Sequence, residues 1–154
     1  MKKIRFTLLI SPPGGGKSTW LNNNFYDIKI DDISIKDNPL EELDLKISKL
    51  KETTSIAIAD INFCDNLILE KARKKLIFLS QKYNFLTEFE HILFIGNKEQ
   101  YLKNIENRND GRNVLQSVLR FYPQIMALNT KHLDKKIVCQ IDYDNKTNFL
   151  TPQP

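Results

Sequence analysis

The chain has 154 residues, of which 41% are hydrophobic and 27% charged, the proportions of an ordinary soluble globular protein. This length predicts one domain, residues 1–154, that can bury a core without disulfides or structural metals. The net charge of +4 is too small to demand a polyanionic partner. Cys64 and Cys139 lack the spacing of a zinc site or a disulfide framework, and no apolar stretch is long enough to span a membrane. We therefore expect a cytoplasmic protein with two reduced, buried thiols.

Apolar residues recur along the chain at the spacings of strands and of amphipathic helices. The expected strands cover residues 4–10, 25–30, 55–60, 89–95 and 137–141. The expected helices cover residues 17–23, 40–50, 65–83, 98–107 and 114–128. Pro123 should kink or shorten the last helix, and the polar residues from about 143 onward should form a loose tail.

This alternation of strands and helices predicts right-handed βαβ units and hence an α/β fold. The arrangement that we expect has three layers. Its sheet would have five strands, mainly parallel, with helices on both faces. In such folds, ligands bind outside the carboxyl ends of the strands. Residues that directly follow a strand are therefore the candidates for ligand binding.

A glycine-rich segment joins the first expected strand to the first expected helix, the context of a phosphate-binding P-loop. It reads Ser11-Pro12-Pro13-Gly14-Gly15-Gly16-Lys17-Ser18-Thr19, with Ser11 where the motif has its first glycine. The glycines let backbone N–H groups converge on phosphates, and the helix N-terminus adds the positive end of its dipole. Lys17 would supply a full charge, and Ser18 would place its hydroxyl on Mg²⁺. The predicted nucleotide-binding residues are Gly14, Gly15, Gly16, Lys17, Ser18 and Thr19.

Aspartates follow the second and third expected strands. They are the pair Asp31-Asp32 and the single residue Asp60, and they should lie beside the P-loop at one edge of the sheet. Asp31 is the candidate general base, with Asp32 as its substitute, because a carboxylate can take the proton of a hydroxyl acceptor. Asp60 could hold Mg²⁺ through water or orient its neighbours. For each aspartate the alternative role is the N-cap of a following helix.

A short polar segment, residues 108–112, separates two expected helices. Arg108 and Arg112 in this segment could close over the triphosphate and supply cations that stabilise charge during phosphoryl transfer. The alternative is that these arginines pair with carbonyls or carboxylates near the helix ends.

Other residues with chemical potential receive structural interpretations. The basic residues of helix 65–83 are expected on a solvated face rather than in a nucleic-acid groove. Trp20 is expected in the core rather than as a platform for a base. His91 and His132 have no partner spacing and are given no role.

The connection between the second and third expected strands is short. Residues 31–54 leave room for one short helix, whereas kinases that enclose a free nucleoside monophosphate usually have an insertion here. The short connection predicts an open groove, which suits the end of a polymer.

In order and spacing, several segments resemble the kinase domain of phage polynucleotide 5′-hydroxyl kinases, over roughly the first 130 residues. The segments are Gly14 to Trp20, Asp31-Asp32, Asp60-Ile61-Asn62, Asn107 to Arg112 and Val118-Leu119-Arg120. The resemblance implies a P-loop kinase-like three-layer fold and transfer of the γ-phosphate of ATP, with Mg²⁺, to the 5′-hydroxyl of DNA or RNA. It also implies that Asp31 is the general base, that Lys17 and Ser18 bind phosphates and Mg²⁺, that Asp60 orients the site, and that Arg112 or Arg108 contacts the transferring phosphate.

The chain departs from that family at Ser34, where the family has an arginine that holds the 3′-phosphate of the substrate. Two alternatives therefore stand beside the polynucleotide kinase. One is a P-loop kinase of a nucleotide or another small hydroxyl compound, and the other is a nucleotide-binding regulator that transfers no phosphate.

Overall fold

A computed structural model of the chain describes residues 2–31, 33, 39–96, 98–108, 115–131, 133, 135–141 and 147–149. Its centre is one six-stranded sheet with the strand order β2-β3-β1-β4-β5-β6. The strands are β1 (Lys3–Ile10), β2 (Ile28–Ile30), β3 (Thr54–Ala59), β4 (Leu86–Phe94), β5 (Lys136–Ile141) and β6 (Thr147–Phe149). Strands β1 to β5 are parallel, and β6 pairs antiparallel with β5. The expected α/β fold with a mainly parallel sheet is confirmed.

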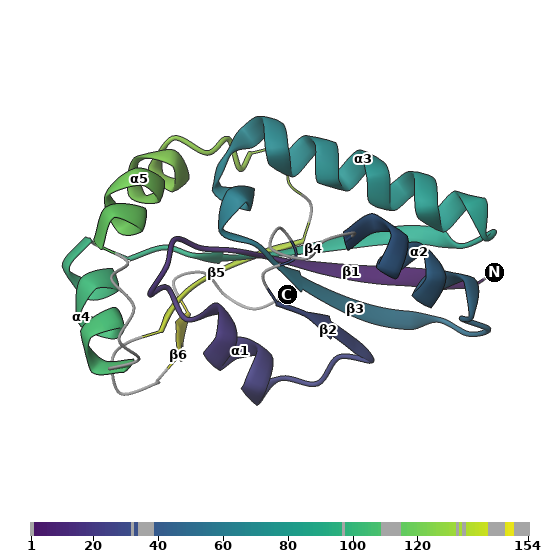
Figure 1. Ribbon diagram of the computed structural model, residues 1–154, viewed down its shortest axis with the longest axis horizontal. Coiled ribbons are helices and arrows are strands. Elements are labelled where there is room, and N and C mark those ends of the chain that lie inside the picture. The colour runs from purple at the N-terminus through teal and green to yellow at the C-terminus, as the bar shows by residue number, and fades with distance from the viewer. Residues whose placement is uncertain are drawn as a thin grey trace.

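The helices cover the two faces of the sheet unequally (Figure 1). They are α1 (Lys17–Asn23), α2 (Pro39–Ser48), η2 (a 3-10 turn, Ile61–Cys64), α3 (Asn66–Lys82), α4 (Lys98–Arg108) and α5 (Leu115–Met126). Figure 1 shows α2 and α3 over one face and α1 under the other, while α4 and α5 lie near the end of the sheet where β1 runs into α1.

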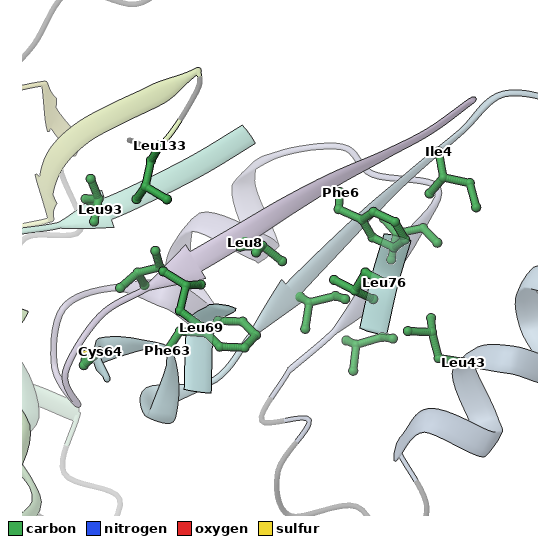
Figure 2. Packing of buried hydrophobic residues seen from close by; sticks show 14 of the residues in the cluster. Ile4, Phe6, Leu8, Leu43, Phe63, Cys64, Leu69, Leu76, Leu93 and Leu133 are labelled. Carbon is green, nitrogen blue, oxygen red and sulfur yellow. The ribbon is translucent and has the colours of Figure 1, made fainter. Parts of the chain in front are cut away.

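Alternate residues of β1 pack on opposite faces of the sheet, as the two-residue period of a strand requires. Its residues Ile4, Phe6, Leu8 and Ile10 are fully buried in the main core with α2, α3 and α5. In Figure 2, Leu43 of α2 and Leu76 of α3 lie on the same side of β1 as Phe6. Burial of such side chains contributes about 1.5–3 kcal/mol each, so this face holds α2 and α3 on the sheet.

The opposite face has a smaller apolar cluster. Leu9 of β1 packs there with Trp20 and Leu21 of α1. The Trp20 ring meets Phe94 edge-on, and its Nε1 donates a hydrogen bond of 2.9 Å to the Tyr26 hydroxyl. Trp20 is 7% exposed, which confirms that it is a core residue.

Strand β2 is shorter than the sequence predicted, beginning at Ile28 instead of residue 25. Phe25 is 85% exposed and outside the ladder. At Asp27 the link to β3 is made through a side chain, because the Asp27 carboxylate accepts hydrogen bonds from the backbone N–H and the hydroxyl of Ser55. Backbone pairing with β3 therefore starts only at Ile28.

Strand β4 begins at Leu86, three residues earlier than predicted, because the polar residues Thr87 and Glu88 obscure the pattern. The strand pairs with β1 from Leu86 to Leu93. Within this paired region, the carboxylate of Glu88 accepts hydrogen bonds from Lys3 (3.2 Å) and Arg5 (3.1 Å). These ion pairs favour the charged carboxylate and lower the pKa of Glu88, the hydrogen bond from Lys3 contributing most.

Helix α5 includes Pro123 and ends at Met126, two residues before the expected end at residue 128. One expectation about the C-terminal third needs correction. The predicted loose tail contains a strand, since β6 pairs with β5 across Cys139 and Phe149. The edge of β5 offers unpaired backbone groups, and a polar segment can satisfy them without an apolar pattern.

None of the helices in the described ranges has the length and apolar character needed to cross a bilayer. Cys64 and Cys139 are buried free thiols, as predicted.

Candidate functional site

The glycine-rich segment lies directly between the end of β1 at Ile10 and the start of α1 at Lys17. Gly14 has φ +82° and Gly16 has φ +104°, conformations that L side chains rarely adopt. A Cβ on Gly14 would also lie 2.3 Å from the backbone oxygen of Tyr101. Both the turn and the close approach of α4 therefore require glycine at position 14.

Ser11 fits the loop without the backbone conformation that only glycine adopts easily. It is fully buried, and among the described non-glycine residues a positive φ occurs at Asn84 and Lys135, not at Ser11. Its hydroxyl donates a 2.6 Å hydrogen bond to the Pro12 carbonyl. A Cβ on Gly15 would come within 1.7 Å of this hydroxyl oxygen. Ser11 thus occupies the space that the missing side chain of Gly15 leaves.

Two polar side chains that the sequence analysis did not single out connect helix α4 to its neighbours, Tyr101 to the end of β4 and Asn104 to the glycine loop. The Tyr101 hydroxyl donates to the Phe94 carbonyl (2.7 Å) and accepts from the Gly96 N–H (2.8 Å). Asn104 donates from Nδ2 to the Gly14 carbonyl at 2.6 Å. The Tyr101 bonds hold α4 at the end of β4, and the Asn104 bond holds α4 against the glycine loop. Neither residue belongs to a motif, so only the packing of α4 identifies them.

The two predicted acids lie at the same edge of the sheet as the loop. Strand β3 lies between β2 and β1, so the ends of β2 and β3, where Asp31 and Asp60 follow, adjoin the end of β1. The Ser18 hydroxyl donates a hydrogen bond of 2.9 Å to Oδ2 of Asp31. The carboxylate of Asp31 therefore reaches the first turn of α1, and it is exposed to solvent.

Asp60 is nearly enclosed, with 4% of its surface exposed. Its Oδ1 accepts a 2.9 Å hydrogen bond from the Asn62 N–H and caps η2, so the N-cap that was the alternative role is present. The charges of Asp60 and of the loop residue Lys17 both reach the Cys64 thiol of η2. Burial raises the pKa of Cys64 to about 12, with a smaller lowering by Lys17 and a smaller raising by Asp60.

Lys17 is 9% exposed, and its charge reaches the Cys64 thiol of η2. Thr19 is half-buried in the first turn of α1. The oxygen atoms of Ser18 and Asp31 suit Mg²⁺, which usually takes one or two carboxylates and completes its shell with phosphates and water. In the part of the chain that the structure describes, no cluster of three or more His, Cys, Asp or Glu side chains could hold a metal alone.

A pocket of about 340 Å³ lies beside the acids, between α2, β3, η2 and α3. We call it the α2–α3 pocket. Its described lining is Ile33, Leu40, Leu43, Ile58, Asp60, Phe63, Ile68, Lys71, Ala72, Lys75 and Leu76. Asp60 is the one acid among these residues, so it borders both the pocket and the surroundings of Lys17.

Some residues named in the sequence analysis lie outside the described part of the chain. Asp32, Ser34 and Arg112 lie outside the described residues, as does His132. Arg108 is the last residue of α4, but its side chain is not described. His91 is fully buried in β4, which β1 separates from the two strands that carry the acids.

The described site thus combines a glycine loop, a buried lysine, a serine bonded to an aspartate and a second, enclosed aspartate at one edge of a parallel sheet. No protein-family model and no curated protein matches the chain.

Proposed function

We propose that this protein is an ATP-dependent kinase that transfers the γ-phosphate of ATP to a hydroxyl group, and we favour the 5′-hydroxyl of a polynucleotide as the acceptor. The observation that carries the proposal is the 2.9 Å hydrogen bond between Ser18 and Asp31. It joins the serine of the glycine loop to an acid borne by another strand, at the edge where parallel sheets bind ligands.

Lys17 and the backbone of the glycine loop would bind the β- and γ-phosphates. Asp31 would accept the proton from the acceptor hydroxyl while the acceptor oxygen bonds to the γ-phosphorus. The bond from that phosphorus to the β,γ-bridging oxygen then breaks, and ADP leaves with its electron pair. General-base help of this kind contributes a factor of about 10² to 10⁴ in rate.

Ser18 would coordinate Mg²⁺, with Asp60 binding it through water or orienting the neighbouring groups. The metal supplies charge neutralisation at the phosphates. The hydroxyl of Ser18 and the carboxylate of Asp60 suit this assignment, since hard cations prefer oxygen ligands. Arg108 and Arg112 remain the proposed lid cations, on the resemblance described above. A cytoplasmic location remains a prediction.

Incubation with γ-labelled ATP, Mg²⁺ and a panel of acceptors tests the proposal. The panel holds oligonucleotides with a 5′-hydroxyl, the same oligonucleotides with a 5′-phosphate, nucleosides and nucleoside monophosphates. Label on the 5′-hydroxyl oligonucleotides alone is the expected result. Label on a small molecule alone would favour the small-molecule kinase, for which the limited volume of the α2–α3 pocket is the supporting observation. ATP binding without transfer to any acceptor would support the alternative, a nucleotide-binding regulator that transfers no phosphate.

A further inference from the structure

The first half of β4 has a neighbouring strand on one side only. Strand β4 pairs with β1 from Leu86 to Leu93, but its pairing with β5 begins at His91. Lys135, the residue before β5, has φ +48°, which is not a strand conformation. Within the described ranges, no strand pairs with the outer side of residues 86–90. We call this open side of residues 86–90 the β4 edge.

Two backbone N–H groups point outward from the β4 edge. Successive N–H groups of a strand point to opposite sides. The Leu86 N–H donates toward β1, to the carbonyl of the residue before that strand, and the His91 N–H donates toward β5, to the Lys135 carbonyl. The alternation therefore turns the N–H groups of Thr87 and Phe89 outward. In the part of the chain that the structure describes, neither has a hydrogen-bond partner, so both can bind an added strand.

A pocket of about 310 Å³ lies between α3 and the β4 edge, and we call it the α3–β4 pocket. The guanidinium of Arg73 lies 5.2 Å from the centre of the Phe89 ring and pairs with Glu70 at 2.8 Å. Its charge is thus already compensated, and the rest of the lining is mainly apolar. The pocket therefore suits an apolar side chain. Its lining is Arg73, Ile77, Gln81, Phe85, Leu86, Thr87 and Phe89.

Two carboxylates lie on the opposite face of the β4 edge, because side chains alternate along a strand. Glu88 is paired with Lys3 and Arg5, whereas Glu90 makes no ion pair within the described ranges. Glu90 is half-buried, and this burial raises its pKa, while the charge of Lys135 lowers it. Opposite charges directly across two strands stabilise their pairing. A basic side chain opposite Glu90 would therefore favour an added strand.

The same charges disfavour a second copy of this chain as the added strand. Antiparallel pairing of two β4 edges around Phe89 would set Glu88 of each copy opposite Glu90 of the other. Like charges in that position destabilise a strand pair. The complementary occupant is instead a segment of another protein in which apolar and basic residues alternate.

We propose that the β4 edge binds an extended segment of a partner protein as an additional strand of the sheet. The segment accepts hydrogen bonds from the N–H groups of Thr87 and Phe89. It turns apolar side chains toward the α3–β4 pocket and a lysine or arginine toward Glu90. In strand addition the backbone bonds give affinity and the alternate side chains give specificity. The β4 edge lies at the end of the sheet away from the glycine loop (Figure 1), so the inference does not depend on the proposed kinase function.

The test uses the acetylated and amidated peptide Lys-Val-Lys-Val-Lys-Val-Lys as the probe. Calorimetry should show that wild type binds it, and amide hydrogen exchange should slow at Thr87 and Phe89 when it is bound. An isomer with its lysines and valines in separate blocks should not bind. Thr87→Pro removes an outward N–H without removing a bond to β1, and it should raise the dissociation constant about fivefold. The control Thr87→Val keeps the N–H and should bind like wild type.

A charge exchange tests the contact with Glu90 separately. Glu90→Lys should weaken binding of the lysine peptide and should create binding of the peptide that has glutamates in place of the lysines. Should Thr87→Pro fail to fold, this exchange and the wild-type hydrogen exchange decide the question. Failure of wild type to bind the lysine peptide, or equal binding of the two isomers, would overturn the inference. Slow exchange at Thr87 and Phe89 without peptide, in a dimer seen by sedimentation, would overturn it in favour of a second copy.

Discussion

The hydroxyl of Ser18 donates a 2.9 Å hydrogen bond to Asp31, and this bond distinguishes the two acids of the site. Asp31 is exposed and is held by a residue of the glycine loop, whereas Asp60 is enclosed and is held by the backbone of η2. A similar pair occurs at the opposite end of the same strands, where Ser55 donates to Asp27 at 3.1 Å. The Asp27–Ser55 pair therefore offers a comparison within the same chain, an aspartate and serine pair that lies away from the glycine loop.

Asp31→Asn should abolish transfer while sparing nucleotide binding. An amide oxygen can still accept the Ser18 hydrogen bond, but it cannot take a proton, so we expect kcat to fall by a factor of about 10² to 10⁴. The dissociation constant for ATP, measured without acceptor, should change little. If Asp31 instead holds the metal, the variant should regain activity at high Mg²⁺, so the activity should be measured across a Mg²⁺ titration.

Asp27→Asn is the matched control for this experiment. It changes the same functional group at the other end of β2, where the carboxylate bonds to Ser55, and it should leave kcat unchanged. Equal loss of activity in the two variants would point to a general effect on β2 and would contradict the role of Asp31 as base.

Asp60 caps η2 and borders the α2–α3 pocket, and two substitutions separate these roles. Asp60→Ala removes the cap on the Asn62 N–H and should lower the free energy of unfolding by about 1 kcal/mol. Asp60→Asn keeps an oxygen at the cap, so its stability should stay near that of wild type. We expect both variants to lose activity, because the carboxylate charge beside Lys17 is missing in each. Urea unfolding and initial rates measure the two effects.

Asp65 provides the comparison for Asp60. Its Oδ1 caps α3 by accepting from the N–H groups of Leu67 and Ile68, and it does not line the pocket. Asp65→Asn should therefore retain both stability and activity. An Asp60→Asn protein with wild-type rates would mean that Asp60 serves only as a cap.

Local signals explain which parts of the fold could be predicted. The glycine loop and the Lys17–Asn23 helix follow from adjacent residues, and the structure begins and ends α1 where the sequence indicated. The shared edge of Asp31 and Asp60 follows from the rule for parallel strands. Strand β6 could not be predicted, because its pairing depends on the open edge of β5 rather than on its own polar residues.

Contacts between distant elements explain what the sequence concealed at the site. Asn104 reaches Gly14 only because α4 packs against the loop. Lys71 and Lys75 are exposed, as expected for the basic residues of this helix, and they also line a pocket because α3 packs beside α2 and β3. A helical pattern identifies the apolar stripe of such a helix, but the charged residues at its margin can face either solvent or a pocket, and the rotation of the helix decides which.

Gly15→Ala should disrupt the loop, and removal of the Ser11 side chain should restore it. The new Cβ would lie 1.7 Å from the Ser11 hydroxyl oxygen, so we expect a loss of about 1–3 kcal/mol in stability and weaker ATP binding. In Ser11→Gly/Gly15→Ala the nearest remaining contact is the Pro12 carbonyl at 3.2 Å, which a small shift relieves. Isothermal calorimetry with ATP and thermal unfolding should both show this recovery.

Gly14→Ala is the control that Ser11→Gly should not rescue. Its Cβ would meet the Tyr101 backbone oxygen at 2.3 Å, and its φ is +82°, so neither obstacle involves Ser11. Rescue of both glycine variants by Ser11→Gly would show that the serine weakens the loop in general, contrary to the specific fit described here.

The buried Cys64 thiol should make stability fall at alkaline pH. Burial raises its pKa from 9.0 to about 12, so between these values the unfolded chain has lost a proton that the folded chain keeps. The stabilising contribution is complete below pH 9 and is lost as the pH approaches 12, with a slope of about 1.4 kcal/mol per pH unit. Urea unfolding under reducing conditions, from pH 8 to 10.5, gives the free energy of unfolding of wild type and of Cys64→Ala. The difference between the two values is taken at each pH, so that the contributions of other titrating groups cancel. That difference should shrink as the pH rises, and Cys139→Ala should behave alike because burial raises its pKa to about 12 as well. A difference that stays constant with pH would mean that the thiol next to Lys17 and Asp60 ionises as easily in the folded protein as in the unfolded chain.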